Sequence, residues 1–236
     1  MIRVDRAELT RNEIVRIAAN RFLNEGYTKT TVASMAKALN MSTGNMTFHF
    51  PTKDHMLAEL VDMLCKYQWK MMEDEAKDGY SSIMAICLEL LAITSACEQD
   101  EVAKDFFLSS YQSEMCMEHI RKNDTERAKE VFKEYCPGWA DEQFEEAETL
   151  VSGIEYATLM TTSNSASLEL RISGALNAIL RIYNVPEDVR KQKIAKVISM
   201  DYRALGLQVL ERFRTYVDSE TEKALYSLLA RKQTAE

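Results

Sequence analysis

The sequence is poor in the residues that interrupt helices. Only 7 of its 236 residues are glycine and 3 are proline, whereas hydrophobic residues make up 46%. Long stretches contain neither glycine nor proline, which is typical of helical proteins and not of sheet proteins with their many turns. The composition predicts an all-α fold, and the chain is long enough to bury a substantial core.

Uncharged apolar runs and paired cysteines are lacking as well. No window of about eighteen residues is apolar and free of charge, and the first residues lack the apolar stretch of a signal peptide. A cytoplasmic protein without a membrane span is therefore expected. The five cysteines are odd in number and form no CxxC pair, which predicts reduced thiols in the core and no metal site or cofactor.

Basic residues are in the minority over the whole chain, which has a net charge of -8, but not at its start. Up to Met56 there are eight basic and five acidic residues, a net charge of +3, so the remainder carries -11. A basic head on an acidic body indicates that only the head would contact a nucleic acid.

The head contains the signals of three short helices. Apolar residues at helical spacing predict a first helix over residues 10–25, which Gly26 ends. A second helix begins at Thr30 or Thr31, whose hydroxyl can cap it, and runs through Leu39, and a third, capped by Ser42, ends before Pro51. With a tight turn between the second and third, these helices predict a helix-turn-helix unit.

The body is predicted to be entirely helical. Thr52 caps a long helix that reaches the region of Gly79, and after Pro186 come one or two helices and a polar tail from about Lys232. Between them the pattern predicts helices over 81–97, 101–121, 125–135, 141–162 and 167–183.

The order of residues in the head carries a family resemblance. It rests on the segments Ile17–Phe22, Gly26–Tyr27, Thr30–Ala36, Met41–Met46 and Phe48–Asp54. Together they resemble the DNA-binding head of the tetracycline-repressor (TetR) family over about the first sixty residues, whereas the rest is similar only in size and helical character. The resemblance implies a helix-turn-helix DNA-binding domain over residues 1–52 and a helical ligand-binding and dimerisation domain over 53–236.

The third helix would be the recognition helix, at about residues 42–49. Its first turn is built from the small residues Ser42, Thr43, Gly44 and Asn45, which suit close approach to the major groove. Asn45 can hydrogen-bond a base edge, and Thr43 a base or a phosphate. The resemblance implies DNA-backbone contacts by Thr31, Thr47, His49 and Lys53, and internal packing by Met35, Leu39, Met46, Phe48 and Phe50.

Three positions depart from the family pattern. Thr43 stands where a lysine is common and Thr47 where the first of two aromatic residues is common, so weaker non-specific affinity or an unusual operator is expected. Asn40 stands where a glycine is usual, and asparagine tolerates the left-handed backbone that the turn needs. Two alternatives for this stretch are a capped corner of an ordinary bundle and a metal site at His49 and His55, which has no third ligand nearby in sequence.

Candidate residues in the body fall into two groups. A flexible aromatic lining for a bulky apolar ligand is predicted from Trp69, Met72, Phe106, Phe107, Tyr111, Met115 and Trp139, with core packing as the alternative. A dimer interface is predicted from Leu150, Ile154 and Ala157 on one helix and Leu168, Ile172, Ala175 and Ile179 on the next.

The resulting hypothesis is a ligand-responsive transcription regulator of the TetR type, a homodimeric repressor that a small apolar or aromatic effector releases from a palindromic operator in double-stranded DNA. An enzyme is not expected, because the sequence has neither a glycine-rich phosphate loop nor a nucleophile elbow. Two alternatives stay open: a regulator with thiol switches at Cys87, Cys97 or Cys116, and an all-helical adaptor without DNA function.

Overall fold

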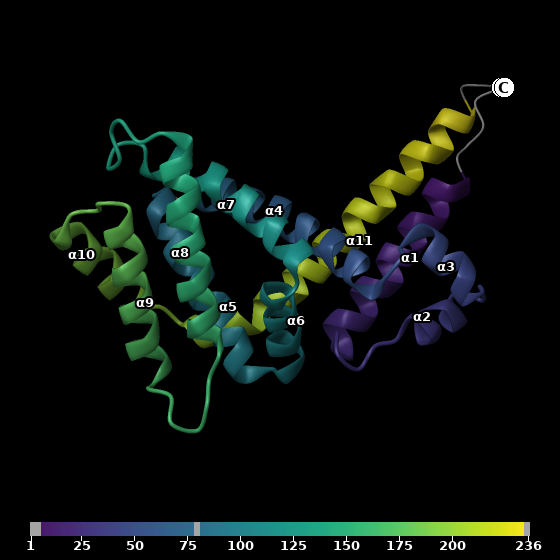
Figure 1. The fold of residues 1–236 in the computed structure, drawn as a ribbon, viewed down its shortest axis with the longest axis horizontal. Helices are drawn as coiled ribbons and strands as arrows, with labels where there is room; N and C mark the ends of the chain where they lie inside the picture. Colours follow the sequence, from purple (N-terminus) through teal and green to yellow (C-terminus); the bar gives the residue numbers. More distant parts are fainter. Residues whose placement is uncertain (1–5, 78–80, 234–236) are drawn as a thin grey trace.

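The computed structural model describes residues 6–77 and 81–233, and these residues form helices without a strand (Figure 1). The predicted all-α fold is thereby confirmed. In chain order the helices are α1 (Arg6–Asn24), α2 (Val32–Ala38), α3 (Thr43–His49), α4 (Lys53–Lys77), α5 (Ser82–Gln99), α6 (Glu101–Gln112), α7 (Glu114–Phe132), α8 (Asp141–Leu159), α9 (Leu168–Ile182), α10 (Glu187–Ile198) and α11 (Tyr202–Gln233).

Two predicted boundaries in the body are wrong. The break expected between residues 121 and 125 lies instead at Ser113, whose hydroxyl accepts a hydrogen bond from the Cys116 N–H at the start of α7. The segment 121–125 contains no glycine or proline, so nothing stops α7 there. Helix α11 also continues to Gln233, past the expected start of the polar tail at about Lys232, and the rest of that tail lies outside the described residues. The end expected near Gly79 lies outside the described residues.

Helix α5 is the central core helix of the body. By length and composition Ser82–Gln99 is apolar enough to cross a membrane, but 72% of it is buried inside the protein. It packs against α11, α6, α4, α10 and α9. Its apolar character is therefore explained by burial on several sides, as expected of a core helix.

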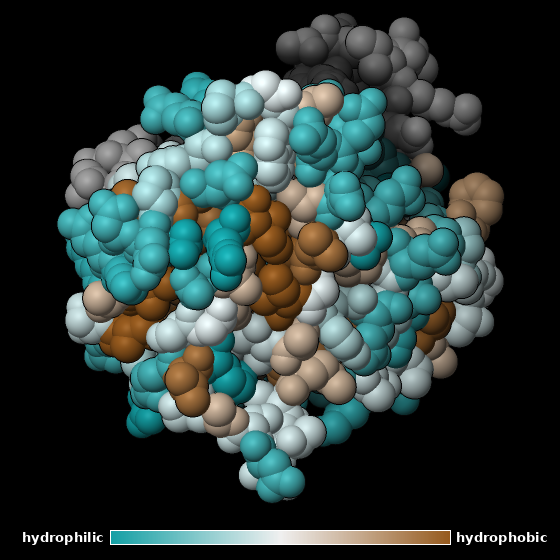
Figure 2. Space-filling model, turned by 60° about the vertical axis from the view of Figure 1, so that its left-hand side comes forward, coloured by the Kyte–Doolittle hydropathy of each residue, from teal (hydrophilic) through white to brown (hydrophobic). Residues whose placement is uncertain are grey.

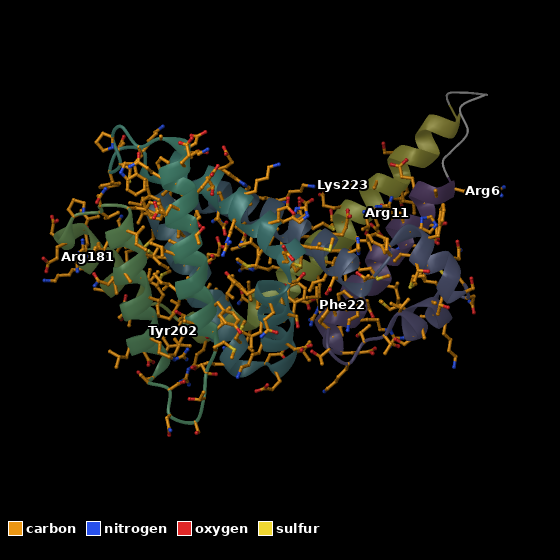
Figure 3. All side chains as sticks on the ribbon, in the orientation of Figure 1. Arg6, Arg11, Phe22, Arg181, Tyr202 and Lys223 are labelled. Atoms are coloured by element: carbon orange, nitrogen blue, oxygen red, sulfur yellow. The ribbon has the colours of Figure 1, made fainter. Side chains whose placement is uncertain are left out.

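The long helix α11 joins the two ends of the molecule. It starts beside α5 and continues along α1, so that the C-terminal part of the chain lies next to the head (Figure 1). The guanidinium of Arg214 donates a hydrogen bond to the Leu23 carbonyl at the end of α1. In Figure 3, α1 extends from Arg6 at the outer end to Phe22 beside the body, and Lys223 of α11 lies near its outer half.

The core is divided between two apolar clusters. One combines buried residues of α1 to α4 with Phe106 of α6 and Phe213 of α11. The other fills the far part of the body and includes Phe132 and Tyr183, whose rings stack at 4.1 Å. Because the first cluster contains residues of both parts, the head is packed against α6 and α11 and has no separate core.

Candidate nucleic-acid interface and interior cavity

The turn between α2 and α3 is fixed by side-chain caps. Thr31 accepts a hydrogen bond from the Ser34 N–H at 3.1 Å, and Ser34 accepts one in return from the Thr31 N–H at 3.3 Å. Ser42 accepts from the Asn45 N–H at 3.1 Å. Asn40 has φ 52°, the left-handed conformation that was expected for it. The caps and the turn follow from these residue types.

Among the described residues, the outer face of α3 is exposed. Its exposed residues are Thr43, Gly44, Asn45, Thr47 and Phe48. Phe48 is 79% exposed, which corrects the expectation that it holds the head together. The reason is helical geometry: Met46 points into the core, and a residue two positions along projects to nearly the opposite side. The Thr47 hydroxyl donates to the Gly44 carbonyl at 3.2 Å.

Lys53, at the start of α4, holds the loop between α1 and α2. Its Nζ donates to the carbonyls of Tyr27 at 2.8 Å and Thr30 at 3.0 Å, and it lies 4.0 Å from the centre of the Tyr27 ring. Burial lowers the pKa of Lys53 from its usual value. These two hydrogen bonds use two of the three ammonium protons within the protein. His49 is half-buried, and its carbonyl accepts from Arg11 at 3.3 Å.

A cavity of about 60 Å³ lies inside the body, between α4, α5, α6, α7, α8 and α9. Part of its wall is aromatic, with Phe107, Tyr111, Phe132 and Tyr183 contributing. A space of this size holds about four water molecules, because each needs roughly 10–15 Å³ on this measure. A bulky ligand would therefore have to separate the surrounding helices.

Two of the residues predicted to line a ligand pocket lie in the wall of this cavity. Phe107 and Tyr111 lie in its wall, but four other predicted residues do not: Trp69, Phe106, Met115 and Trp139. Phe106 is buried in the first core cluster, away from the cavity wall. The Trp139 ring packs edge-on against Phe144. The Trp69 indole donates to Asn123 at 2.8 Å. The side chain of Met72 lies outside the described residues.

The wall also carries charged groups that the sequence interpretation missed. Arg127 pairs with Glu89 at 2.5 Å and with Asp124 at 3.3 Å. Tyr183 donates a hydrogen bond to Glu148, and Tyr111 donates to Glu155 at 2.8 Å. Charged side chains and tyrosine hydroxyls therefore line the cavity beside the aromatic and apolar residues.

Burial is the main reason why the pKa values of these acids are raised. It raises the pKa of Glu148 to about 8 and that of Asp124 to about 6, in both cases with a contribution from a neighbouring carboxylate. The pKa of Glu155 rises well above its usual value through burial, then through Asp124 and Glu148. Such shifts mark a site where carboxyl groups are crowded away from water.

One sequence signal was available for the acidic wall. Glu148 and Glu155 are seven residues apart on α8, so they lie on one side of the helix, the side that also carries Val151 and Leu159 into the core. Two acids in register with an apolar stripe are unusual. The partners on α5 and α7 gave no such signal, because only the tertiary packing brings them together.

The residues of the predicted dimer stripe differ in their exposure, and the interface itself stays a prediction. On α8, Leu150 is 55% exposed and Ala157 is exposed, with Ile154 half-buried. On α9 all four predicted residues are buried within the chain's own core, which corrects the prediction for that helix: Leu168, Ile172, Ala175 and Ile179. The outer side of α9 instead exposes Leu170 and Gly174. Figure 2, which brings the α8 to α10 end forward, shows apolar surface among hydrophilic side chains.

The cysteines are buried and unpaired, as expected of core residues. Burial raises the pKa of Cys116 to about 11 and the pKa values of Cys87 and Cys97 to about 12. A redox-sensing thiol needs access and a lowered pKa. The structure therefore gives no support to a thiol switch at these positions.

The geometry of α1 to α3 defines a helix-turn-helix protein. Residues 14–60 match the family model described as bacterial regulatory proteins of the tetR family. Over these residues the chain is therefore similar to the DNA-binding head of the tetR family.

One curated protein is similar to part of the chain. The HTH-type transcriptional regulator QacR of Staphylococcus aureus (strain Mu50 / ATCC 700699) is 29% identical over 70 residues, which are 28% of this chain and 37% of that protein. Thus the match spans little more than a third of the relative's length.

Two solved structures are similar at low scores. The TetR family protein CprB from S. coelicolor A3(2) has a TM-score of 0.45 and 18% identity, over 82% of this chain and 98% of that one. A gamma-butyrolactone receptor described as ArpA-like has a TM-score of 0.44 and 17% identity, over 87% and 99% of the two chains. Similarities this distant carry no inference about what the body binds.

Proposed function

We propose that this protein is a ligand-responsive transcription regulator that binds operator DNA as a homodimer in the cytoplasm. The observation that carries the proposal is the coincidence of the family match at residues 14–60 with the exposed face of α3. Ser42 to Asn45 begin the helix that would enter the major groove, and Asn45 is the residue that would bind a base edge. The body, from residue 53 onward, would receive the effector and form the dimer.

Effector binding can reach the head through two helices that line the cavity. Helix α4 contributes Val61 and Leu64 to the cavity wall and holds the α1–α2 loop through Lys53. Helix α6 contributes Phe107 to the wall and holds the same loop through Asp105, which accepts from the Thr28 N–H at 2.8 Å. A ligand that separates these helices would move the loop, and with it α2 and α3.

A homodimer would place two copies of α3 in successive major grooves of a palindromic operator. Support for the interface comes from the exposed apolar residues Leu150 and Met160 at α8 and Leu170 on α9. Glycines at 153 and 174 have open space around them and permit close approach of a second helix. Repression would end when the effector changes the separation of the two recognition helices.

The proposal is tested by fluorescence anisotropy with the DNA upstream of the protein's own gene and with a scrambled duplex of the same composition. At about 0.15 M salt, where non-specific contacts are screened, we expect clearly tighter binding to the upstream DNA. Asn45→Ala should reduce this preference while affinity for the scrambled duplex stays unchanged. Equal affinity of the wild-type protein for both duplexes would contradict the proposal. Light scattering on the same sample reports whether the protein is a dimer.

A further inference from the structure

The cavity in the body has more acids than bases. Four carboxyl groups line it, on Glu89, Asp124, Glu148 and Glu155, against the single guanidinium of Arg127. Arg127 is engaged by Glu89 and Asp124, which leaves Glu148 and Glu155 without an ion pair among the described residues. Their hydrogen-bond donors are the neutral hydroxyls of tyrosines 183 and 111.

A second observation at the same place is a donor without an acceptor. The side chain of Arg127 is 5% exposed, and its Nε–H is buried with no hydrogen-bond partner among the described residues. An orphan donor of this kind is rare in native interiors, because an unpaired buried polar group is costly. A molecule with an acceptor atom in the cavity would satisfy this donor.

The geometry points to a small monovalent organic cation with a hydrogen-bond acceptor as the effector that this cavity takes. This inference rests on the proposed function, because it names the chemical class of the effector. The unpaired carboxyl groups of Glu148 and Glu155 would face the positive charge, and Arg127 would donate to the acceptor. The rings of Phe107 and Phe132 would contact the cation through their negative faces.

A metal ion fits the described residues less well than an organic cation. They contain no group of three histidine, cysteine, aspartate or glutamate side chains arranged to hold a metal. The cavity of about 60 Å³ has space for about four waters, so only a small molecule fits without movement of the surrounding helices. A larger cation of the same class would have to push α4 and α6 outward.

Binding of such a cation should release protons. Burial raises the pKa of Glu148 to about 8 and raises that of Glu155 well above its usual value, so both carboxyl groups favour the protonated form. An entering cation favours the ionised carboxylates, so their protons pass to solvent. The titratable and charged groups that face these two acids are Cys65 on α4, Glu89 on α5, Tyr111 on α6, Asp124 and Arg127 on α7, and Tyr183 after α9.

The test uses probes that separate charge from shape. Choline carries a permanent positive charge and a hydroxyl, 3,3-dimethylbutan-1-ol has the same shape without the charge, and tetramethylammonium has the charge without the hydroxyl. Titration calorimetry on the full-length protein should show choline binding at least tenfold tighter than the neutral alcohol and tighter than tetramethylammonium. Affinity for choline should rise from pH 6 to pH 8, and the heat should differ between phosphate and Tris buffers, because released protons are taken up by the buffer.

Substitutions in the cavity test whether its carboxyl groups cause the preference for a charged ligand. Glu155→Gln keeps a group that can bond Tyr111 but cannot become negative, so it should remove most of the preference for choline over the neutral alcohol. Glu148→Gln should reduce proton release. Glu145→Gln, on the exposed side of the same helix, makes the same chemical change and should have no effect. Circular dichroism on each variant verifies the fold.

The outcomes distinguish this inference from the proposed function. Equal affinity for choline and its neutral isostere, or an unchanged preference in folded Glu155→Gln, would overturn the cation inference. Operator binding measured on the same preparations would then still support the proposed function. Equal binding of the wild-type protein to operator and scrambled DNA would overturn the proposed function whatever the calorimetry shows.

Discussion

Asp105 on α6 holds the backbone of Thr28 in the loop between α1 and α2. The Thr28 N–H lies 2.8 Å from Oδ2, and the Thr28 hydroxyl donates to Oδ1. Gly26 lies against the same carboxylate: a Cβ there would come within 2.9 Å of Oδ2, and its φ of 98° disfavours other residues. Since Phe107 is two residues further on in the cavity wall, a single helix connects the cavity to the head.

The first prediction concerns this connection. Asp105→Ala should lower the free energy of unfolding by about 1 kcal/mol, the usual net contribution of a hydrogen bond that solvent can reach. A double-mutant cycle with Thr28→Ala, followed by urea denaturation, should give a coupling energy of at least about 0.5 kcal/mol between the two residues. Additive effects would show that the contact in the structure is not formed in solution. In DNA-binding assays, the effector should release Asp105→Ala less completely than the wild type.

The second prediction concerns Lys53. Lys53→Met keeps an apolar stem on the Tyr27 ring but removes the charge, so it should weaken binding to operator and scrambled DNA alike. If the remaining ammonium proton meets a phosphate, the slope of log affinity against log salt should fall by about one per protomer. Lys66→Met, an exposed change of the same kind further along α4, is the control and should leave both quantities unchanged. A weakened affinity with an unchanged slope would make Lys53 a residue that only positions the loop.

The third prediction concerns the exposed ring of Phe48. An apolar side chain that is 79% exposed on the recognition helix is suited to the C5-methyl group of thymine, which is the apolar feature of the major groove. Phe48→Ala should therefore weaken operator binding by about 1 kcal/mol. Replacing the contacted thymine by deoxyuridine, which lacks the methyl group, should weaken wild-type binding by a similar amount and leave Phe48→Ala unaffected. A deoxyuridine effect of equal size in both proteins would place the methyl contact elsewhere.

Features set by neighbouring residues could be predicted from the sequence, and features set by distant packing could not. The caps at Thr31 and Ser42 and the left-handed Asn40 depend on side chains acting within three residues, and all three were found as expected. The break at Ser113 depends on the same kind of cap, but no glycine or proline marks it. The sequence prediction therefore placed this helix boundary too far along the chain.

The residues that line the cavity could not be predicted from the sequence. Residues from six helices line it, and an apolar or aromatic side chain is equally suited to a core, so Phe106 and Phe107 could not be told apart by type. The burial of the apolar stripe of α9 within the chain's own core could not be predicted for a related reason. A helix with one apolar face must bury it, but periodicity does not say whether the partner is the same chain or a second copy.

The fourth prediction concerns stability and pH. The pKa of Glu148 is raised in the folded protein to about 8 from an ordinary value of 4.5, so the folded state holds a proton that the unfolded state releases. The resulting stabilisation is complete below about pH 4.5 and is lost as pH rises toward 8, on the order of a few kcal/mol. Urea denaturation should therefore give a lower free energy of unfolding at pH 8 than at pH 6. Glu148→Gln should flatten this dependence and be more stable than the wild type at pH 8, whereas Glu145→Gln should follow the wild type.

The fifth prediction concerns the contact between α5 and α11. Gly206 lies so close to α5 that an added Cβ would be 2.8 Å from the Ala96 nitrogen and 2.9 Å from the Ser95 carbonyl carbon, which are backbone atoms that cannot rotate away. Gly206→Ala would gain about 1 kcal/mol of helix propensity, but overpacking costs about 1–3 kcal/mol, so a net loss of stability is expected. Leu207→Ala on the exposed side of the same helix should change stability by less than about 0.5 kcal/mol. Because α11 continues from this contact to α1, Gly206→Ala should also increase amide hydrogen exchange at the end of α1 near Leu23. A variant that is more stable than the wild type would mean that α11 lies further from α5 in solution, and that the head is not held from this side.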